Sequence, residues 1–223
     1  MKISASILSC DLLRLVDDIK RLEDAGANSL HVDIMDGAYV DNFAFGVNMV
    51  ERVKGVTRLP LEVHLEINNG DRHIETFARA GADTIILQAD TVRHPIRALE
   101  TIRGLGLVAG YAVNPAEEVP RAILSGKYID YLLVMTAEPG FGGQKMNEDC
   151  LYKVKEAKQG DPEITVGVDG GVNQQNFMRL YRLGVDVAVM GTAVFRGGMI
   201  EENLRSFHEL EEQENRPGKY ATI

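Results

Sequence analysis

Two histidines and two aspartates lie in short apolar segments of the sequence, at positions that could bring their side chains together. His31 and Asp33 are separated by one apolar residue, and His64 and Asp169 each lie near the end of a similar segment. Because side chains alternate between the two faces of a β-strand, His31 and Asp33 point to the same face. A buried imidazole or carboxylate is costly unless it is paired, and one divalent cation would satisfy all four groups.

Two histidines and two aspartates form a ligand set that suits Zn²⁺, Fe²⁺, Mn²⁺ or Co²⁺ better than Mg²⁺ or Ca²⁺. The alternative is a polar network in the protein core, in which the same four side chains are satisfied by hydrogen bonds without a metal. We expect the metal site, because four such residues near strand ends are more than a core network requires.

Glycine-rich stretches in the second half of the chain have the composition of an anion-binding site. Glycines let backbone N–H groups approach an anion closely, and the N-terminus of a following helix adds its dipole. Such a site needs no lysine or arginine, so it suits an acidic protein that binds a phosphorylated substrate. The stretches are PGFGGQ at 139–144, DGG at 169–171 and MGTA at 190–193.

The elements that position these residues follow one another in a regular rhythm. Short apolar segments predict β-strands, and amphipathic segments between them, many ending in Gly or Ala-Gly, predict helices. We expect eight helices, the last at 200–214. The eight predicted strands lie at 2–8, 29–35, 61–67, 84–90, 107–113, 131–137, 165–171 and 187–193.

Strict alternation of strand and helix predicts a parallel sheet with right-handed crossovers. Eight such units in 223 residues suit an α/β fold of the closed (β/α)8 TIM barrel type. An open, doubly wound parallel sheet is the alternative. No linker, low-complexity tract or break in composition divides the chain, so we expect a single domain over 1–223, with 215–223 as a surface tail.

A barrel also predicts which way the side chains of the strands point. Outward-facing residues pack under helices and should be apolar, as Leu30 and Val32 are. Inward-facing residues near the carboxyl end of a strand line the mouth, where active sites of this fold lie. The residues expected to point inward are His31, Asp33 and Met35 in one strand and Glu62, His64 and Glu66 in the next.

Composition narrows the class of protein. The chain is 45% hydrophobic and 26% charged, and its net charge of −9 argues against a nucleic-acid partner. No apolar run approaches the ~20 residues of a membrane span, and the N-terminus has no signal-peptide pattern, so we expect a cytoplasmic protein without a membrane partner. Cys10 and Cys150 have no metal-binding spacing and are expected to be reduced thiols.

Six motifs in order along the chain resemble the ribulose-phosphate 3-epimerase family. They span Ser6 to Phe195 and read SIL, LHVDIMDG, VHL, VMTAEPGFGGQK, VDGGVN and GTAVF. The resemblance implies a (β/α)8 barrel that interconverts D-ribulose 5-phosphate and D-xylulose 5-phosphate. It also implies one divalent metal ion (Zn, Fe, Mn or Co), a phosphorylated ketose as substrate and a homo-oligomer.

Position by position, the resemblance implies metal ligands at His31, Asp33, His64 and Asp169, with Asp33 and Asp169 also the catalytic acid/base pair. Inverting a carbon beside a carbonyl removes a proton from one face and returns one to the other through an enediolate, which suits two carboxylates and a metal. The residues expected to bind substrate are Ser6, Met35, His64, Met135, Gly140, Phe141, Gly142, Gly143, Gly170, Gly171, Gly191 and Thr192.

The chain departs from the family pattern at the mouth of the barrel. Glu66 stands where the family usually has Met, and Gln88 stands where it usually has His, so both are expected to affect substrate specificity. Glu66 could contact a sugar hydroxyl or could be a carboxylate on the rim that reaches the surface. Ala38 and Asp41 replace residues common in the family, and Ala5 replaces a Pro.

These departures leave alternatives to the pentulose reaction open. The first is 3-epimerisation of another ketose phosphate, such as D-allulose 6-phosphate, since a longer sugar would need different contacts at the mouth. Others are a barrel that binds a phosphosugar without catalysis, and a metal-dependent decarboxylase or aldolase. The intact Asp33 and Asp169 favour an epimerase.

Overall fold

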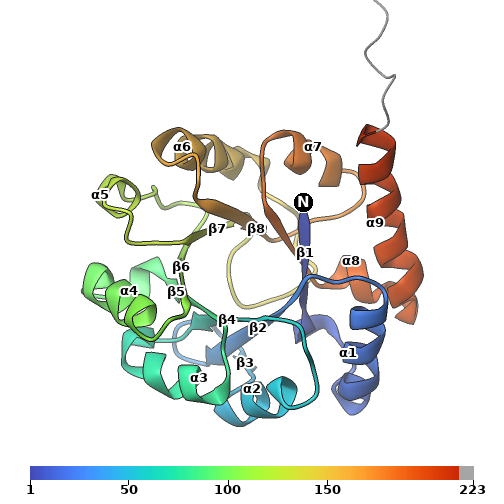
Figure 1. The fold of residues 1–223 in the computed structure, drawn as a ribbon, viewed down its shortest axis with the longest axis horizontal. Coiled ribbons are helices and arrows are strands. Elements are labelled where there is room, and N and C mark those ends of the chain that lie inside the picture. The colour runs from blue at the N-terminus through green and yellow to red at the C-terminus, as the bar shows by residue number, and fades with distance from the viewer. Residues whose placement is uncertain (216–223) are drawn as a thin grey trace, which may run out of the picture.

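The computed structural model describes residues 1–215, which form a closed barrel of eight parallel strands surrounded by helices (Figure 1). Pairing of the first two strands, with Ser6 opposite His31, closes the barrel and confirms the predicted TIM barrel fold. The barrel strands are β1 (Lys2–Ser6), β2 (Ser29–Asp36), β4 (Leu61–Glu66), β5 (Thr84–Gln88), β6 (Val108–Val113), β7 (Tyr131–Met135), β8 (Thr165–Asp169) and β9 (Val187–Met190).

A ninth strand, β3 (Phe43–Ala44), pairs antiparallel with the end of β2 and lies outside the barrel ladder. It was not predicted, because two residues carry no periodic pattern. The predicted tail at 215–223 lies outside the described residues except for Asn215, which ends the last helix.

The helices cover the outside of the barrel (Figure 1), and a helix lies between each pair of successive barrel strands and after the last one, as the predicted alternation requires. An additional short helix, α8, follows β9. The helices are α1 (Leu15–Asp24), α2 (Val47–Lys54), α3 (Ile74–Ala80), α4 (Pro95–Gly104), α5 (Arg121–Ser125), α6 (Tyr152–Gly160), α7 (Phe177–Arg182), α8 (Thr192–Phe195) and α9 (Ile200–Asn215). Single 3₁₀ turns lie at Ile7–Ser9, Leu12–Arg14, Gly70–His73, Ala89–Thr91, Glu148–Leu151 and Arg196–Gly198.

The first helix begins later than its sequence suggests. The segment from Asp11 onward has helical periodicity, but the Asp11 carboxylate accepts a hydrogen bond from the Leu13 backbone N–H and caps a 3₁₀ turn instead. The α-helix starts only at Leu15. Aspartate commonly caps a turn in this way, because its short side chain reaches a backbone N–H two residues on.

Side chains of the strands alternate between two different environments. The outward-facing Leu30, Val32 and Ile34 of β2 are buried in the apolar layer under the helices. Inside the barrel, β5, β6, β7 and β9 contribute an apolar cluster of Ile86, Ala112, Tyr131, Leu133, Met135, Val187 and Val189. The remaining strands β1, β2, β4 and β8 place polar side chains inside, so the interior contains both an apolar cluster and a polar one.

Two simpler expectations concern membranes and thiols. Within residues 1–215, no helix is both long enough and apolar enough to cross a membrane. Cys10 and Cys150 are free thiols, and burial raises the pKa of Cys10 to about 11. Neither thiol therefore has the lowered pKa of a reactive cysteine.

Helix α9 is held against α7 by the contact of two phenyl rings. Phe207 of α9 and Phe177 of α7 are almost fully buried, with ring centroids 4.8 Å apart. We expect Phe207→Ala to lower the free energy of unfolding by about 3–5 kcal/mol in urea titrations, because it leaves a cavity between the helices. Glu209→Ala, on the exposed side of the same helix, should change it by less than about 0.5 kcal/mol. Equal effects of the two substitutions would show that α9 is not anchored through this contact.

Candidate active site and metal centre

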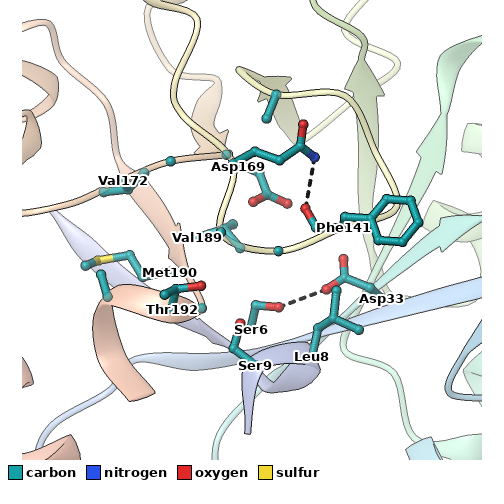
Figure 2. A pocket seen from close by; sticks show the side chains of 18 of the residues that line it. Ser6, Leu8, Ser9, Asp33, Phe141, Asp169, Val172, Val189, Met190 and Thr192 are labelled. Atoms are coloured by element: carbon teal, nitrogen blue, oxygen red, sulfur yellow. Dashed lines mark hydrogen bonds between the residues drawn. The ribbon is translucent and has the colours of Figure 1, made fainter. Parts of the chain in front are cut away.

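A pocket opens at the carboxyl ends of the barrel strands, where the loops that follow them meet (Figure 2). Its lining includes Ser6 from β1, Asp33 from β2, Asp169 from β8 and Thr192 after β9. Strands that are distant in sequence therefore contribute side chains to a single cavity, as the direction of the inward-facing residues predicts. This is the face on which enzymes with this fold carry their active sites.

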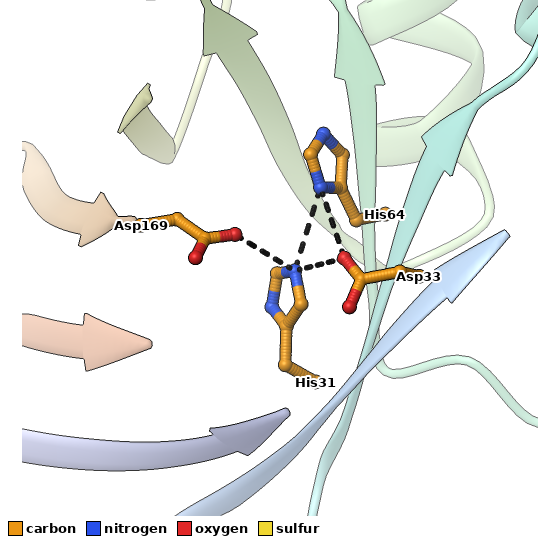
Figure 3. A group of neighbouring side chains, drawn as sticks. All are labelled: His31, Asp33, His64 and Asp169. Atoms are coloured by element: carbon orange, nitrogen blue, oxygen red, sulfur yellow. Dashed lines mark hydrogen bonds and ion pairs between the residues drawn. The ribbon is translucent and has the colours of Figure 1, made fainter. Parts of the chain in front are cut away.

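The two histidines and two aspartates predicted from sequence converge on one another (Figure 3), and the two aspartates also line the pocket. His31 Nε2 lies 3.1 Å from Asp33 Oδ1, 3.4 Å from His64 Nδ1 and 3.8 Å from Asp169 Oδ2. One ligand atom from each residue lies within 4.8 Å of all the others. Atoms bound to one metal at about 2.0–2.2 Å have separations of this size, so the geometry fits a single divalent ion.

The ring orientation of His31 is fixed by a carboxylate on the far side from the cluster. His31 Nδ1 lies 3.3 Å from Glu62 Oε2, and a carboxylate accepts hydrogen bonds, so Nδ1 carries the proton. Ser4 and Ser29 donate hydrogen bonds to the two oxygens of Glu62 and hold it in place. When His31 is neutral its lone pair is therefore on Nε2, the atom that faces the other three residues of the cluster.

A chain of side-chain amides fixes the second histidine. The Asn114 amide donates to Asp90 Oδ2 at 3.1 Å, so its Oδ1 is the acceptor for Gln88 Nε2 at 2.7 Å. This leaves Gln88 Oε1 to accept from His64 Nε2 at 2.8 Å. When His64 is neutral its lone pair is consequently on Nδ1, again the atom that faces the cluster.

Burial and neighbouring charges shift the pKa values of the two aspartates in opposite directions. Burial alone raises the pKa of a carboxyl group, but the adjacent His31 outweighs this effect and holds the pKa of Asp33 below its usual range. At Asp169 burial dominates and raises the pKa to about 6. Ser6 Oγ donates to Asp33 Oδ2 at 2.8 Å, a bond that also favours the ionised form of Asp33 (Figure 2).

The histidines respond to the same charges in the opposite direction. Burial lowers the pKa of each imidazole, but nearby carboxylates, Asp33 above all, raise the pKa of His31 and His64 above the usual value. The cluster of four side chains thus favours positive charge. A divalent cation can supply that charge in place of protons, and its binding would release them.

Glu66 of β4 points into the same pocket and is only 2% exposed, which excludes a rim carboxylate that reaches the surface. Its Oε1 lies 3.8 Å from His64 Nδ1, whereas its Oε2 accepts no hydrogen bond from any residue between 1 and 215. Burial raises the pKa of Glu66 to about 8.

Glycines from the three loops that follow β7, β8 and β9 line one side of the pocket. At Gly170 and Gly171 the backbone has φ of +115° and +70°, and a Cβ at Gly171 would lie 2.2 Å from the backbone nitrogen of Met146. Only glycine therefore allows these loops to approach each other. The predicted phosphate-binding residues Gly142, Gly143, Gly170, Gly171, Gly191 and Thr192 all line the pocket.

Comparison with known proteins assigns the family. The sequence profile of the Ribulose-phosphate 3 epimerase family matches residues 2–195. A ribulose-phosphate 3-epimerase from Bacillus subtilis is 39% identical over 202 residues, covering 87% of this chain and 92% of the relative. One from Helicobacter pylori is 39% identical over 203 residues, covering 88% and 91%. The chain belongs to the ribulose-phosphate 3-epimerase family. It is therefore an enzyme, an isomerase of the epimerase type.

Solved structures outside this family share the barrel. The KGPDC structure from Streptococcus mutans has a TM-score of 0.72 at 13% identity, covering 95% of this chain and 97% of that one. The 3-hexulose-6-phosphate synthase of Salmonella typhimurium has a TM-score of 0.70 at 18% identity, covering 96% and 99%. At these identities the likeness concerns the fold alone.

Of the remaining predicted site residues of this epimerase-family chain, some line the pocket and one does not. Ser6, Met35, Met135, Gly140 and Phe141 line the pocket. Gln88, a residue expected to affect specificity, lies behind His64 and is fully buried, so it contacts the imidazole and does not line the pocket.

Sequence reasoning missed three contributors to the site. Glu62 was expected to face inward but had no assigned role, and its partnership with His31 depends on two serines from other strands. Asn114 gave no signal, because its role rests on contacts with distant residues. Arg196, four residues after Thr192, is the one cationic side chain among the described residues that line the pocket. The sequence signal for Arg196 was its position soon after the last barrel strand, next to a glycine-rich stretch that was expected to bind phosphate.

Removal of one ligand should weaken metal binding without unfolding the barrel. We expect His64→Ala to lower the affinity for Zn²⁺ or Mn²⁺ by about 100-fold or more, measured by competition with a chelator, because one of four ligands is lost. The exposed His94 provides the control, and His94→Ala should bind metal like the wild type. Unchanged affinity in His64→Ala would remove this residue from the metal site.

The amide chain behind His64 gives an independent test. Gln88→Leu keeps the approximate size of the side chain but removes the acceptor that fixes the imidazole. We expect metal affinity to fall by about 10- to 100-fold, as when an outer partner of a metal ligand is lost. Wild-type affinity in this variant would mean that the Gln88 contact does not orient His64 for metal binding.

Proposed function

We propose that this chain is a metal-dependent ketose-phosphate 3-epimerase that interconverts D-ribulose 5-phosphate and D-xylulose 5-phosphate. The observation that carries the proposal is the position of Asp33 and Asp169, which line one pocket, belong to the four-residue cluster and have opposite pKa shifts. The relatives in Bacillus subtilis and Helicobacter pylori bear the name of this reaction.

The cation would be held by His31 Nε2, His64 Nδ1 and one carboxylate oxygen each of Asp33 and Asp169. When bound, a divalent ion stabilises the negative charge of the enediolate by several kcal/mol, which makes a weak carbon acid accessible to a carboxylate base. Two imidazoles and two carboxylates suit Zn²⁺, Fe²⁺, Mn²⁺ or Co²⁺.

The two aspartates supply the proton transfers. They come from β2 and β8, which β1 and β9 separate around the barrel, so they can approach a planar intermediate from different sides. One aspartate is ionised and takes the C3 proton from one face, and the other is protonated and returns a proton to the opposite face. In the reverse direction the two roles exchange.

The rest of the pocket holds the two ends of the substrate. The glycine loops after β7, β8 and β9 offer backbone N–H groups to the phosphate, and Arg196 adds the positive charge that an acidic pocket otherwise lacks. Met35 and Met135 are each 4% exposed and line the centre of the pocket, where apolar side chains keep water away from the enediolate.

The reaction leaves a signature at one carbon. In D₂O, the wild-type enzyme should place deuterium at C3 of D-ribulose 5-phosphate and D-xylulose 5-phosphate, which NMR detects directly. We expect Asp33→Asn and Asp169→Asn each to lower kcat by about 100-fold or more, because each removes a proton-transfer group.

The exposed Asp41 at the same face provides a matched control, and Asp41→Asn should keep most of the wild-type rate. Full activity in either of the first two variants would remove that aspartate from the mechanism. A panel that includes D-allulose 6-phosphate tests the chain length of the sugar, and a higher kcat/KM for this compound than for D-ribulose 5-phosphate would replace the pentulose assignment.

A further inference from the structure

Two glutamates on the same inward face of β4 differ in the hydrogen bonds that their carboxylate oxygens accept. Both oxygens of Glu62 accept hydrogen bonds, from Ser4 and from Ser29. Glu66, four residues on and 2% exposed, has an oxygen that no described residue contacts by a hydrogen bond. Leaving a buried carboxylate oxygen unpaired is costly, so a group that enters the pocket is expected to satisfy it.

The barrel fixes where along a bound substrate this oxygen lies. In the ring of eight strands, β4 lies directly across from β8, with three strands between them on either side. The glycine loops that would hold the phosphate follow β7, β8 and β9, and the four-residue cluster joins side chains of β2, β4 and β8. A ketose phosphate that spans the pocket from its phosphate therefore directs its opposite end, the C1 hydroxymethyl group, towards Glu66.

We propose that the free oxygen of Glu66 accepts a hydrogen bond from the C1 hydroxyl of the ketose phosphate and makes the enzyme selective for substrates with that hydroxyl. The inference rests on the proposed 3-epimerase function and identifies a residue that determines specificity within it. A carboxyl oxygen can accept a hydrogen bond from a hydroxyl group whether the carboxyl group is ionised or protonated.

The geometry separates this role from that of a fifth metal ligand. His31, Asp33, His64 and Asp169 each offer an atom within 4.8 Å of all the others, and Glu66 is not a member of that group. Its nearer oxygen is 3.8 Å from His64 Nδ1, and the other oxygen remains free. Glu66 therefore lies beside the cluster, in a position to contact what binds there.

The test compares D-xylulose 5-phosphate with 1-deoxy-D-xylulose 5-phosphate, which has a methyl group in place of the C1 hydroxymethyl. The measured quantity is kcat/KM for deuterium exchange at C3 in D₂O. We expect the wild type to prefer the hydroxylated compound by about 10- to 100-fold, because the analogue leaves the Glu66 oxygen unpaired. Glu66→Met should reduce this preference below about threefold, mainly by losing activity on D-xylulose 5-phosphate.

Two further variants sharpen the comparison. Glu66→Gln keeps an amide oxygen that accepts a hydrogen bond, so its preference should lie between those of the wild type and Glu66→Met. Glu138 is a second carboxylate that lines the pocket, and Glu138→Gln should leave the preference unchanged. Because the preference is a ratio within one protein sample, partial misfolding of a variant does not alter it.

Each remaining outcome overturns a defined claim. An equal preference in the wild type and Glu66→Met would overturn the role of Glu66, and so would a loss of bound metal in Glu66→Met, measured by elemental analysis. If the metal-loaded wild type exchanges C3 of no ketose phosphate, the proposed function fails, and the inference fails with it. Exchange of D-xylulose 5-phosphate without any preference over the deoxy compound would contradict the inference alone.

Discussion

The rest of the site depends on the concentration of acidic side chains inside the barrel, where little water reaches them. Asp33, Glu62, Glu66 and Asp169 come together around only two imidazoles. Burial disfavours the ionised carboxylate and raises the pKa values of Glu66 and Asp169, whereas at His31 the adjacent carboxylates outweigh burial and raise the pKa. The same surroundings suit the cluster to hold a cation and its carboxyl groups to transfer protons.

The strand register holds these charges in place. In the parallel ladder of β2 and β4, His31 pairs with Glu62, Asp33 with His64 and Met35 with Glu66. A shift of one residue would turn every one of these side chains to the outside, against the apolar layer under the helices, so the hydrophobic pattern of the strands also protects the site. The apolar cluster inside the barrel supports the arrangement, because its close packing leaves the polar side chains little freedom to rearrange.

The fold and the cluster were predictable from the sequence because both follow from alternation. Period-two patterns such as that of 29–35 indicate which side chains face inward, and eight strand–helix units indicate closure. The short strand β3, the 3₁₀ turn at Leu12–Arg14 and the roles of Glu62 and Asn114 could not be predicted. These features depend on local capping or on side-chain contacts between distant strands, and neither leaves a periodic signal. For Glu66 the sequence left two alternatives, which only its burial in the folded chain distinguishes.

The central claim is that Glu62 and Gln88 orient two imidazoles so that their lone pairs, together with two aspartates, hold one divalent ion. Anomalous diffraction from crystals of the protein loaded with Mn²⁺ or Zn²⁺, recorded at the absorption edge of the metal, tests it most directly. The account predicts one strong peak at about 2.0–2.2 Å from His31 Nε2, His64 Nδ1 and an oxygen each of Asp33 and Asp169. A peak elsewhere, or ligation through His31 Nδ1 or His64 Nε2, would contradict it.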